Sequence, residues 1–364
     1  MVPQETRDMS SAISRRQLLA LITALITAPI PALTLTALAR AADIGGAPQD
    51  IANLGAPDAA LEKKIADLAL GIGLNRVGFA AVDLANGRTA FLREGELFPM
   101  QSLCKLPIAI AFMYQVEQGK ANLNRKVRLT AADIVPGRSP LAARLRAKPT
   151  NFTAQQLIEH MLLNSDNTAT DALMKLAGGP AKIQAVLKKI DGLDGLRIDR
   201  YERDLQPEAV GLRANANYAD PEKFDAAIAS LGARKQRAAL QRFIADPRDS
   251  TSPRAFALLY FKLLSGHLLD MQHATFLLDL MRRTKTGADR LNAGMPPGWT
   301  FAHRGGQSKT IQGISAAFND SGLATHRKGA KIVIVLLVEG ATLETARLAD
   351  FHRAVAGEVL EAWK

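Results

Sequence analysis

The order in which strand-like and helix-like segments follow one another leaves few folds open to this chain. Two apolar strand-like segments, residues 76–84 and 88–93, flank Ala85-Asn86-Gly87, which is a strong hairpin signal. The chain after residue 106 has mostly helical periodicity, with helices predicted at residues 154–163, 168–176, 180–190, 221–245 and 253–264. Strand patterns return after Trp299, at residues 300–304, 314–323 and 331–338.

This order predicts an α+β fold in which one antiparallel sheet of about five strands is built from both ends of the chain. Further helices are predicted before the first strand, at residues 58–70, and after the last, at residues 343–363. We expect an α/β lobe from residues 59–105 and 297–364, with an all-helical lobe from residues 106–296 inserted into it. Clefts between such lobes are the usual small-molecule sites.

The N-terminal segment has the pattern of an export signal. Ser14-Arg15-Arg16-Gln17-Leu18-Leu19 is a twin-arginine motif, and an uncharged run follows it up to the small-x-small site Ala39-Arg40-Ala41. The run is long enough for a membrane anchor, but Pro29 and Pro31 interrupt it. We therefore expect residues 1–41 to be a cleaved signal peptide, residues 42–58 to be a linker, and the mature protein to be periplasmic with no membrane anchor.

The composition is that of an ordinary globular protein, with 48% hydrophobic and 22% charged residues. The net charge is +11, but the positive residues are dispersed and only 5% of residues are aromatic, so nucleic acid is not an expected partner. The six histidines show no metal-ligand spacing, and the single cysteine excludes an internal disulfide. We expect the protein to use neither a metal nor a cofactor and to be a monomer.

Ser102-Leu103-Cys104-Lys105 places a hydroxyl and an amine three residues apart. On a helix these two side chains share a face, and a lysine in a water-poor cleft can activate a serine for attack on a carbonyl. Ser102 would also lie at a helix N-terminus, where unpaired N–H groups favour developing negative charge. Cys104 is expected to be a buried apolar filler, with a thiol nucleophile as the alternative.

Two polar segments in the helical region add further candidates. In Ser165-Asp166-Asn167, the hydroxyl can pass a proton to a leaving nitrogen and the Asn167 amide can hold a carbonyl. The other segment carries Arg200, Glu202 and Gln206; alone it is typical of a solvated loop.

Taken together, these segments resemble the class A β-lactamases, whose Ser-x-x-Lys, Ser-Asp-Asn and Arg-x-Glu-x-x-Leu-Asn motifs occur here in the same order. The resemblance covers residues 58 to 364 and implies that family's fold and a β-lactam substrate. It makes Ser102 the nucleophile, Lys105 its basic partner and Ser165 the proton relay. Asn167 would contact the acylamide side chain, and Glu202 would activate the deacylating water, on a loop that Arg200 holds. Whether the lysine or the glutamate is the base for acylation is disputed for the family.

The sequence departs from the family pattern in two places. The loop asparagine is Gln206, which can offer its amide only from a shifted position, so slower deacylation is expected. The strand motif Lys-Thr-Gly becomes Arg304-Gly305-Gly306, in which Arg304 keeps the charge expected to face a substrate carboxylate and Gly305 lacks the assisting hydroxyl. The resemblance implies that Gly306 and Gln307 continue this substrate-binding strand, with the backbone N–H groups of Ser102 and Gln307 forming an oxyanion hole.

Two other functions remain open at this point: a cell-wall D-Ala peptidase or esterase with the same acylation machinery, and a sensor that stays acylated. The Glu202 segment argues against the peptidase, because a water activator has little purpose in transpeptidation. His303 is expected to pack beside the strand rather than to act in catalysis. Residues 207–250 form an insertion that is expected to add surface helices or, alternatively, to cover the cleft.

Overall fold

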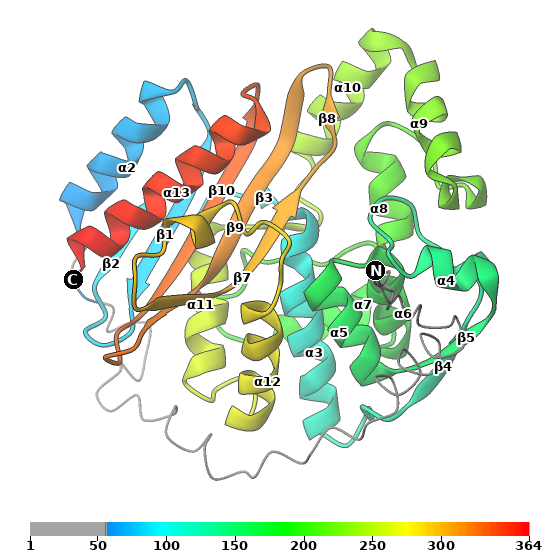
Figure 1. The fold of residues 1–364 in the computed structure, drawn as a ribbon, viewed down its shortest axis with the longest axis horizontal. Coiled ribbons are helices and arrows are strands. Elements are labelled where there is room, and N and C mark those ends of the chain that lie inside the picture. The colour runs from blue at the N-terminus through cyan, green and yellow to red at the C-terminus, as the bar shows by residue number, and fades with distance from the viewer. Residues whose placement is uncertain (1–54, 56, 364) are drawn as a thin grey trace, which may run out of the picture. The chain divides into compact units, whose positions relative to one another are not determined.

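The computed structural model describes residue 55 and residues 57–363, and its centre is an antiparallel sheet built from both ends of the chain (Figure 1). The strands follow the order β2-β1-β10-β9-β7, and a short strand, β8, also pairs with β9. Their bounds are β1 (Val77–Asp83), β2 (Thr89–Leu92), β7 (Trp299–Gln307), β8 (Thr310–Ile311), β9 (Ile314–His326) and β10 (Lys331–Ala341). This arrangement confirms the predicted fold class.

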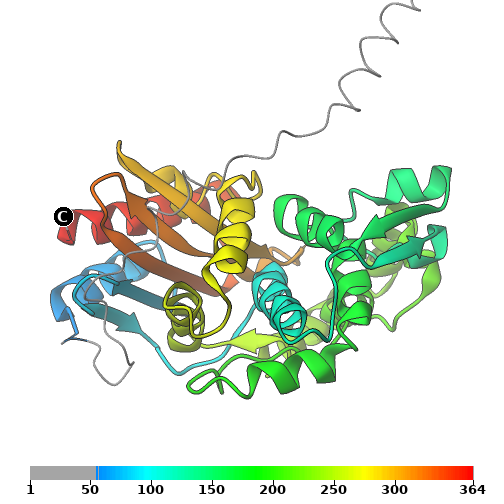
Figure 2. The ribbon, with the colours of Figure 1, turned by 90° about the horizontal axis from the view of Figure 1, so that it is seen from below.

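The sheet is covered by helices on both faces, which explains why β1 is buried at every residue (Figure 2). Alternate residues of β1 point to opposite faces. Phe79 packs in one core with α2 (Ala59–Gly71) and α13 (Thr345–Ala362), and Ala80 packs in another with α11 (Pro253–Leu264). The predicted β1–β2 hairpin is confirmed, and Gly87 at its turn has a positive φ of 75°.

The middle of the chain is mainly helical, as predicted. Its helices are α3 (Lys105–Glu117), α4 (Ala142–Ala147), α5 (Ala154–Asn164), α6 (Asn167–Leu176), α7 (Pro180–Leu187), α8 (Glu202–Ala209), α9 (Pro221–Ser230), α10 (Gly232–Ala245), α11 and α12 (Met271–Arg282). Helices α11 and α12 pack against the sheet. Two small strand pairs, β3 (Phe98–Pro99) with β6 (Ser250–Thr251) and β4 (Lys126–Leu129) with β5 (Thr150–Thr153), were not predicted. The lobe boundaries at residues 105/106 and 296/297 stay a prediction.

Two details of the helix predictions were wrong. Residues 221–245 form two helices, because the helix ends at Ser230 and a new one begins at Gly232, whose φ is +69°. Ser102 lies on a short 3-10 turn, η2 (Gln101–Cys104), and α3 begins only at Lys105. A 3-10 turn also aligns residues three apart, so Ser102 and Lys105 still share a face.

The expected signal peptide over residues 1–41 and most of the expected linker over residues 42–58 lie outside the described residues. Within residues 57–363, no helix combines the length and the apolar character needed to span a bilayer.

Candidate active site

Ser102 is held where the turn η2 packs against strand β7. Gln101 has a positive φ of 50°, which turns the chain sharply before Ser102. A Cβ at Gly306 of β7 would lie 2.3 Å from the carbonyl oxygen of Met100 and 3.2 Å from the nitrogen of Ser102. Only glycine at position 306 therefore lets β7 approach the turn this closely.

The Ser102 hydroxyl contacts both side chains that the sequence analysis assigned to it. Lys105 Nζ donates a hydrogen bond to Ser102 Oγ over 2.9 Å, and Ser165 Oγ donates to the same oxygen over 3.0 Å. Ser165 reaches this position because it ends α5 in the left-handed conformation, with a φ of 59°. Two of the three candidates thus lie within hydrogen-bonding distance of the third.

Glu202 is linked to Ser102 through Lys105. The ammonium of Lys105 is fully buried and donates to Glu202 Oε1 over 2.6 Å and to Asn167 Oδ1 over 2.9 Å. The second carboxylate oxygen, Glu202 Oε2, accepts a hydrogen bond from the Gln206 side chain over 2.8 Å. Burial opposes ionisation of Glu202, but the charge and hydrogen bonds of Lys105 and Gln206 outweigh it and lower the pKa of this carboxyl group.

The start of α8, which carries Glu202, is fixed from two sides. Buried Asp171 on α6 accepts from the Glu202 backbone N–H over 2.7 Å and from Arg203 Nε over 2.9 Å. Burial raises the pKa of Asp171 to about 6, despite these bonds. Arg200 pairs with Asp249 over 2.6 Å and with Glu208 over 2.7 Å, which joins the segment to the end of the insertion.

Arg304 lies behind Ser165 and is completely buried. Its guanidinium donates to Ser165 Oγ, to the Ser102 carbonyl oxygen over 3.1 Å and to the Leu162 carbonyl oxygen over 3.0 Å. No carboxylate of the described residues forms an ion pair with it, and burial lowers its pKa to about 10. Arg304 therefore remains a cation at neutral pH, but it reaches the cleft through Ser165 rather than by lining it.

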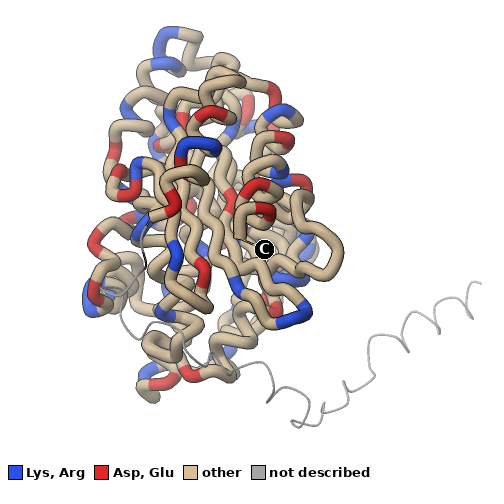
Figure 3. The backbone as a smooth tube through the Cα atoms, turned by 90° about the vertical axis from the view of Figure 1, so that its left-hand side faces the viewer, with Lys and Arg blue, Asp and Glu red and all other residues tan. Residues whose placement is uncertain are grey.

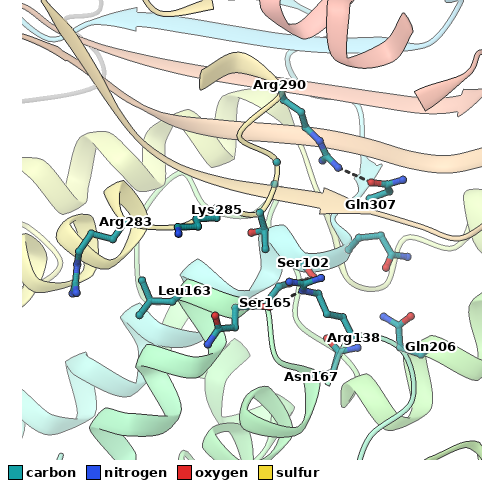
Figure 4. A pocket seen from close by; sticks show the side chains of 15 residues that line it. Ser102, Arg138, Leu163, Ser165, Asn167, Gln206, Arg283, Lys285, Arg290 and Gln307 are labelled. Carbon is teal, nitrogen blue, oxygen red and sulfur yellow. Dashed lines mark hydrogen bonds between the residues drawn. The ribbon is translucent and has the colours of Figure 1, made fainter. Parts of the chain in front are cut away.

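These groups border a cleft of about 800 Å³ (Figure 4). Five of the predicted site residues line it: Ser102, Ser165, Asn167, Gln206 and Gln307. Lys105, Glu202, Arg304 and Gly306 lie in the wall behind the lining. Four cationic lining residues were missed by the sequence analysis, namely Arg138, Arg283, Lys285 and Arg290. Arg283, Lys285 and Arg290 lie on one segment that follows α12, and Arg138 lies on the segment before α4. The basic run at residues 282–285 is a local signal for two of them, whereas Arg138 and Arg290 have no such signal.

Arg290 lies next to the space that a side chain at position 305 would occupy. A Cβ at Gly305 would lie 3.0 Å from Arg290 Nη1. The Arg290 guanidinium is buried and donates to Gln307 Oε1 over 2.6 Å and to the Asn319 carbonyl oxygen over 2.7 Å. A second cation thus stands beside β7 where a larger side chain at position 305 would compete with it.

The other candidates lie apart from the cleft lining. Cys104 is buried, and burial raises the pKa of its thiol, which argues against a thiolate nucleophile. His303 is buried, stacks on Phe301 and contacts Asp320 over 3.0 Å. The insertion forms α9 and α10, and Lys309 beside β8 pairs with Asp225 of α9.

One group of side chains has metal-ligand geometry. Ligand atoms of Glu117, Asp270 and His273 lie within 4.8 Å of one another. His273 Nδ1 already contacts Glu117 Oε1 over 2.8 Å, and Asp270 caps the N-terminus of α12. Capping and hydrogen bonding account for this group without an ion.

The comparisons with known proteins agree with this geometry. Residues 60–363 match the beta-lactamase enzyme family, and the chain belongs to that family. It is a β-lactamase-type serine hydrolase of class A.

Two sequence relatives are beta-lactamases of Streptomyces. The one from Streptomyces albus G is 28% identical over 81% of this chain and 83% of its own length. The one from Streptomyces cellulosae is 27% identical over 74% of both chains.

Among solved structures, a beta-lactamase from Chitinophaga pinensis DSM 2588 is 26% identical and has a TM-score of 0.68, covering 84% of this chain and all of its own. An ancestral class A beta-lactamase is 28% identical with a TM-score of 0.67, covering 83% of this chain and 99% of its own. The similarity therefore spans nearly all of the described residues.

Proposed function

We propose that the protein opens the amide bond of β-lactams through an acyl-enzyme on Ser102 and releases the product with water activated by Glu202. The observation that carries this proposal is the continuous hydrogen-bonded series Ser165–Ser102–Lys105–Glu202, with contacts of 3.0, 2.9 and 2.6 Å. Such a series brings a nucleophile, a proton acceptor and a proton donor to one point on the cleft.

In acylation, Ser102 Oγ attacks the β-lactam carbonyl carbon while its proton passes to Lys105, which in turn gives a proton to Glu202 over the 2.6 Å contact. The backbone N–H groups of Ser102 and Gln307 stabilise the oxyanion. The carbon–nitrogen bond of the ring then breaks, and Ser165 donates its proton to the leaving nitrogen. The Lys105–Glu202 pair returns a proton to Ser165, which restores the Glu202 carboxylate.

In deacylation, the Glu202 carboxylate takes a proton from a water molecule that attacks the ester on Ser102. The bond between the carbonyl carbon and Ser102 Oγ then breaks and the ring-opened acid leaves, while the proton on Glu202 returns to Ser102 Oγ through Lys105 and restores the carboxylate. Gln206 acts on this step, because its amide holds Glu202 Oε2 at 2.8 Å and lines the cleft. Asn167, which bonds to Lys105 and also lines the cleft, is proposed to hold the acylamide group of the substrate. Arg304 keeps Ser165 oriented and adds positive charge beside Gly306, where the substrate carboxylate would bind.

A sensor that stays acylated is the second candidate, and one contact favours it. The Gln206 amide already occupies one oxygen of Glu202, so a water molecule has to share that carboxylate or displace the amide.

Mixing the mature protein with a chromogenic cephalosporin, while following colour and intact mass, tests the proposal. Sustained colour is expected from the hydrolase, and Ser102→Ala should give neither colour nor a mass adduct. A stoichiometric burst with a persistent adduct supports the sensor instead. No colour and no adduct with the unaltered protein would refute both and favour a peptidase or esterase.

We also propose that the protein is exported to the periplasm and loses residues 1–41 on the way. The mature protein is proposed to be a monomer. The Arg15-Arg16 motif supports this, and beta-lactamases are typically exported. Replacing both arginines by lysine should leave the uncleaved precursor in the cytoplasm. If the variant still reached the periplasm with the mass of the processed protein, the twin-arginine assignment would be wrong.

A further inference from the structure

The charged side chains that line the cleft all have one sign. On the side of the molecule shown in Figure 3, acidic and basic residues are interspersed along the backbone. Of the fifteen residues that line the cleft, four are cationic (Arg138, Arg283, Lys285 and Arg290), and none is Asp or Glu. A cleft lined by one sign of charge concentrates ligands of the opposite sign.

Few of these cations are neutralised by the protein itself. Arg283 pairs with Asp279 over 2.9 Å, but Arg138, Lys285 and Arg290 form no ion pair with any residue in the described part of the chain. Behind the lining, the charges of Lys105 and Glu202 cancel, while Arg304 adds a buried cation. The site therefore retains several positive charges for a ligand to balance.

Two of the unpaired cations, Arg290 and Arg138, lie on different walls of the cleft, on different sides of Ser102 (Figure 4). Arg290 precedes β7, bonds to the side chain of Gln307 and is next to Gly305. This wall suits the carboxylate on the ring of a β-lactam, because it adjoins the proposed oxyanion hole. A substrate with one carboxylate satisfies this wall alone.

Arg138 belongs to the opposite wall and is tied to the segment that carries Asn167. Its Nε donates to the Asn164 carbonyl oxygen over 2.7 Å, and its own carbonyl oxygen accepts from the Asn167 backbone N–H over 2.8 Å. Its exposed guanidinium retains further donors for a ligand. An acylamide group held by Asn167 would bring its substituent close to Arg138.

We infer that the preferred substrates are β-lactams with a second carboxylate on the acylamide side chain, and that Arg138 binds this carboxylate. The inference rests on the proposed function for the position of the substrate. The ring carboxylate is bound at the Arg290 wall and the side-chain carboxylate at the Arg138 wall, so that a dianion balances both.

Two penicillins that differ in a single carboxylate test this inference: benzylpenicillin and its α-carboxy derivative, carbenicillin. Their equilibrium binding is measured on Ser102→Ala, which cannot be acylated at Ser102, and their kcat/KM is measured on the protein with Ser102 intact. Carbenicillin is expected to bind about tenfold more tightly than benzylpenicillin, as a charge-assisted hydrogen bond predicts. Adding Arg138→Gln should weaken carbenicillin binding by about tenfold more than benzylpenicillin binding, which removes the preference.

The matched control is Arg128→Gln, which removes the same charge from an exposed position on β4, outside the cleft lining. It should leave the preference intact. Equal binding of the two penicillins, or equal losses for both on Arg138→Gln, would overturn the inference. Because binding is measured without turnover, a protein that binds the dianion selectively but never hydrolyses it refutes the proposed function and not the charge preference.

Discussion

Lys105 and Arg304 are both completely buried beside Ser102, but their charges are balanced differently. Lys105 has a carboxylate partner, Glu202, at 2.6 Å, so the pair is neutral overall and a proton can move within it. Arg304 bonds only to hydroxyl and carbonyl oxygens, and its pKa of about 10 keeps it charged. One side of the site is therefore suited to proton transfer and the other to attracting an anion.

The largest effect is expected when the cation of the neutral pair is removed. Lys105→Met should slow acylation by about 10²- to 10⁴-fold, because the proton acceptor of Ser102 is lost. It should also lower the free energy of unfolding by about 3–5 kcal/mol, because Glu202 remains as a buried carboxylate without a cation. Adduct formation by mass spectrometry and urea unfolding measure the two effects. Lys182→Met, at an exposed site on α7, is the control and should change neither.

Removing the unbalanced cation should affect chemistry more than stability. Arg304→Met is expected to slow acylation by about tenfold to a hundredfold, since Ser165 loses a hydrogen bond from a charged donor. The loss of unfolding free energy should be smaller than for Lys105→Met, because no carboxylate is left unpaired. A larger loss of stability than for Lys105→Met, measured in the same urea titrations, would break the comparison.

Contacts between residues that are close in sequence could be predicted, whereas contacts between distant residues could not be predicted from local patterns. The β1–β2 hairpin follows from Asn86-Gly87, and the Ser102–Lys105 contact follows from a spacing of three residues. Glu202 lies 97 positions from Lys105, so only the family resemblance suggested their proximity.

The burial of Arg304 and the approach of Arg138 and Arg290 to the cleft depend on tertiary packing. β7 packs closely against the turn η2 because position 306 is glycine, and the guanidinium of Arg304 is enclosed behind Ser165. No periodicity or motif encodes such contacts.

The pH dependence of stability tests whether Lys105 stabilises the ionised Glu202 carboxylate. Glu202 has a lowered pKa in the folded state, so its ionisation stabilises the fold above its unfolded value near 4.5 and loses this effect as the pH falls through the folded pKa. The unfolding free energy of the protein relative to Glu202→Gln should therefore decrease as the pH falls below about 4.5. A difference that stays constant or grows on acidification would show that Lys105 does not stabilise the carboxylate.

The smallest effect is expected at Gln206. Gln206→Ala removes one hydrogen bond to Glu202 Oε2, so deacylation should slow by about tenfold. Acylation should stay within about twofold, because Lys105 keeps its contacts with Ser102 and Glu202. Stopped-flow turnover and the lifetime of the mass adduct separate the steps. Faster deacylation would mean that the Gln206 amide obstructs the water instead of orienting the carboxylate.

The central claim is that Glu202, reached from Ser102 through Lys105, releases the acyl group. Its most direct test is a time course of intact mass after a β-lactam is mixed with the unaltered protein and with Glu202→Ala. We predict that the adduct clears from the unaltered protein and accumulates on Ser102 in the variant. Unchanged turnover in Glu202→Ala, or an adduct that maps to Cys104, would contradict the account.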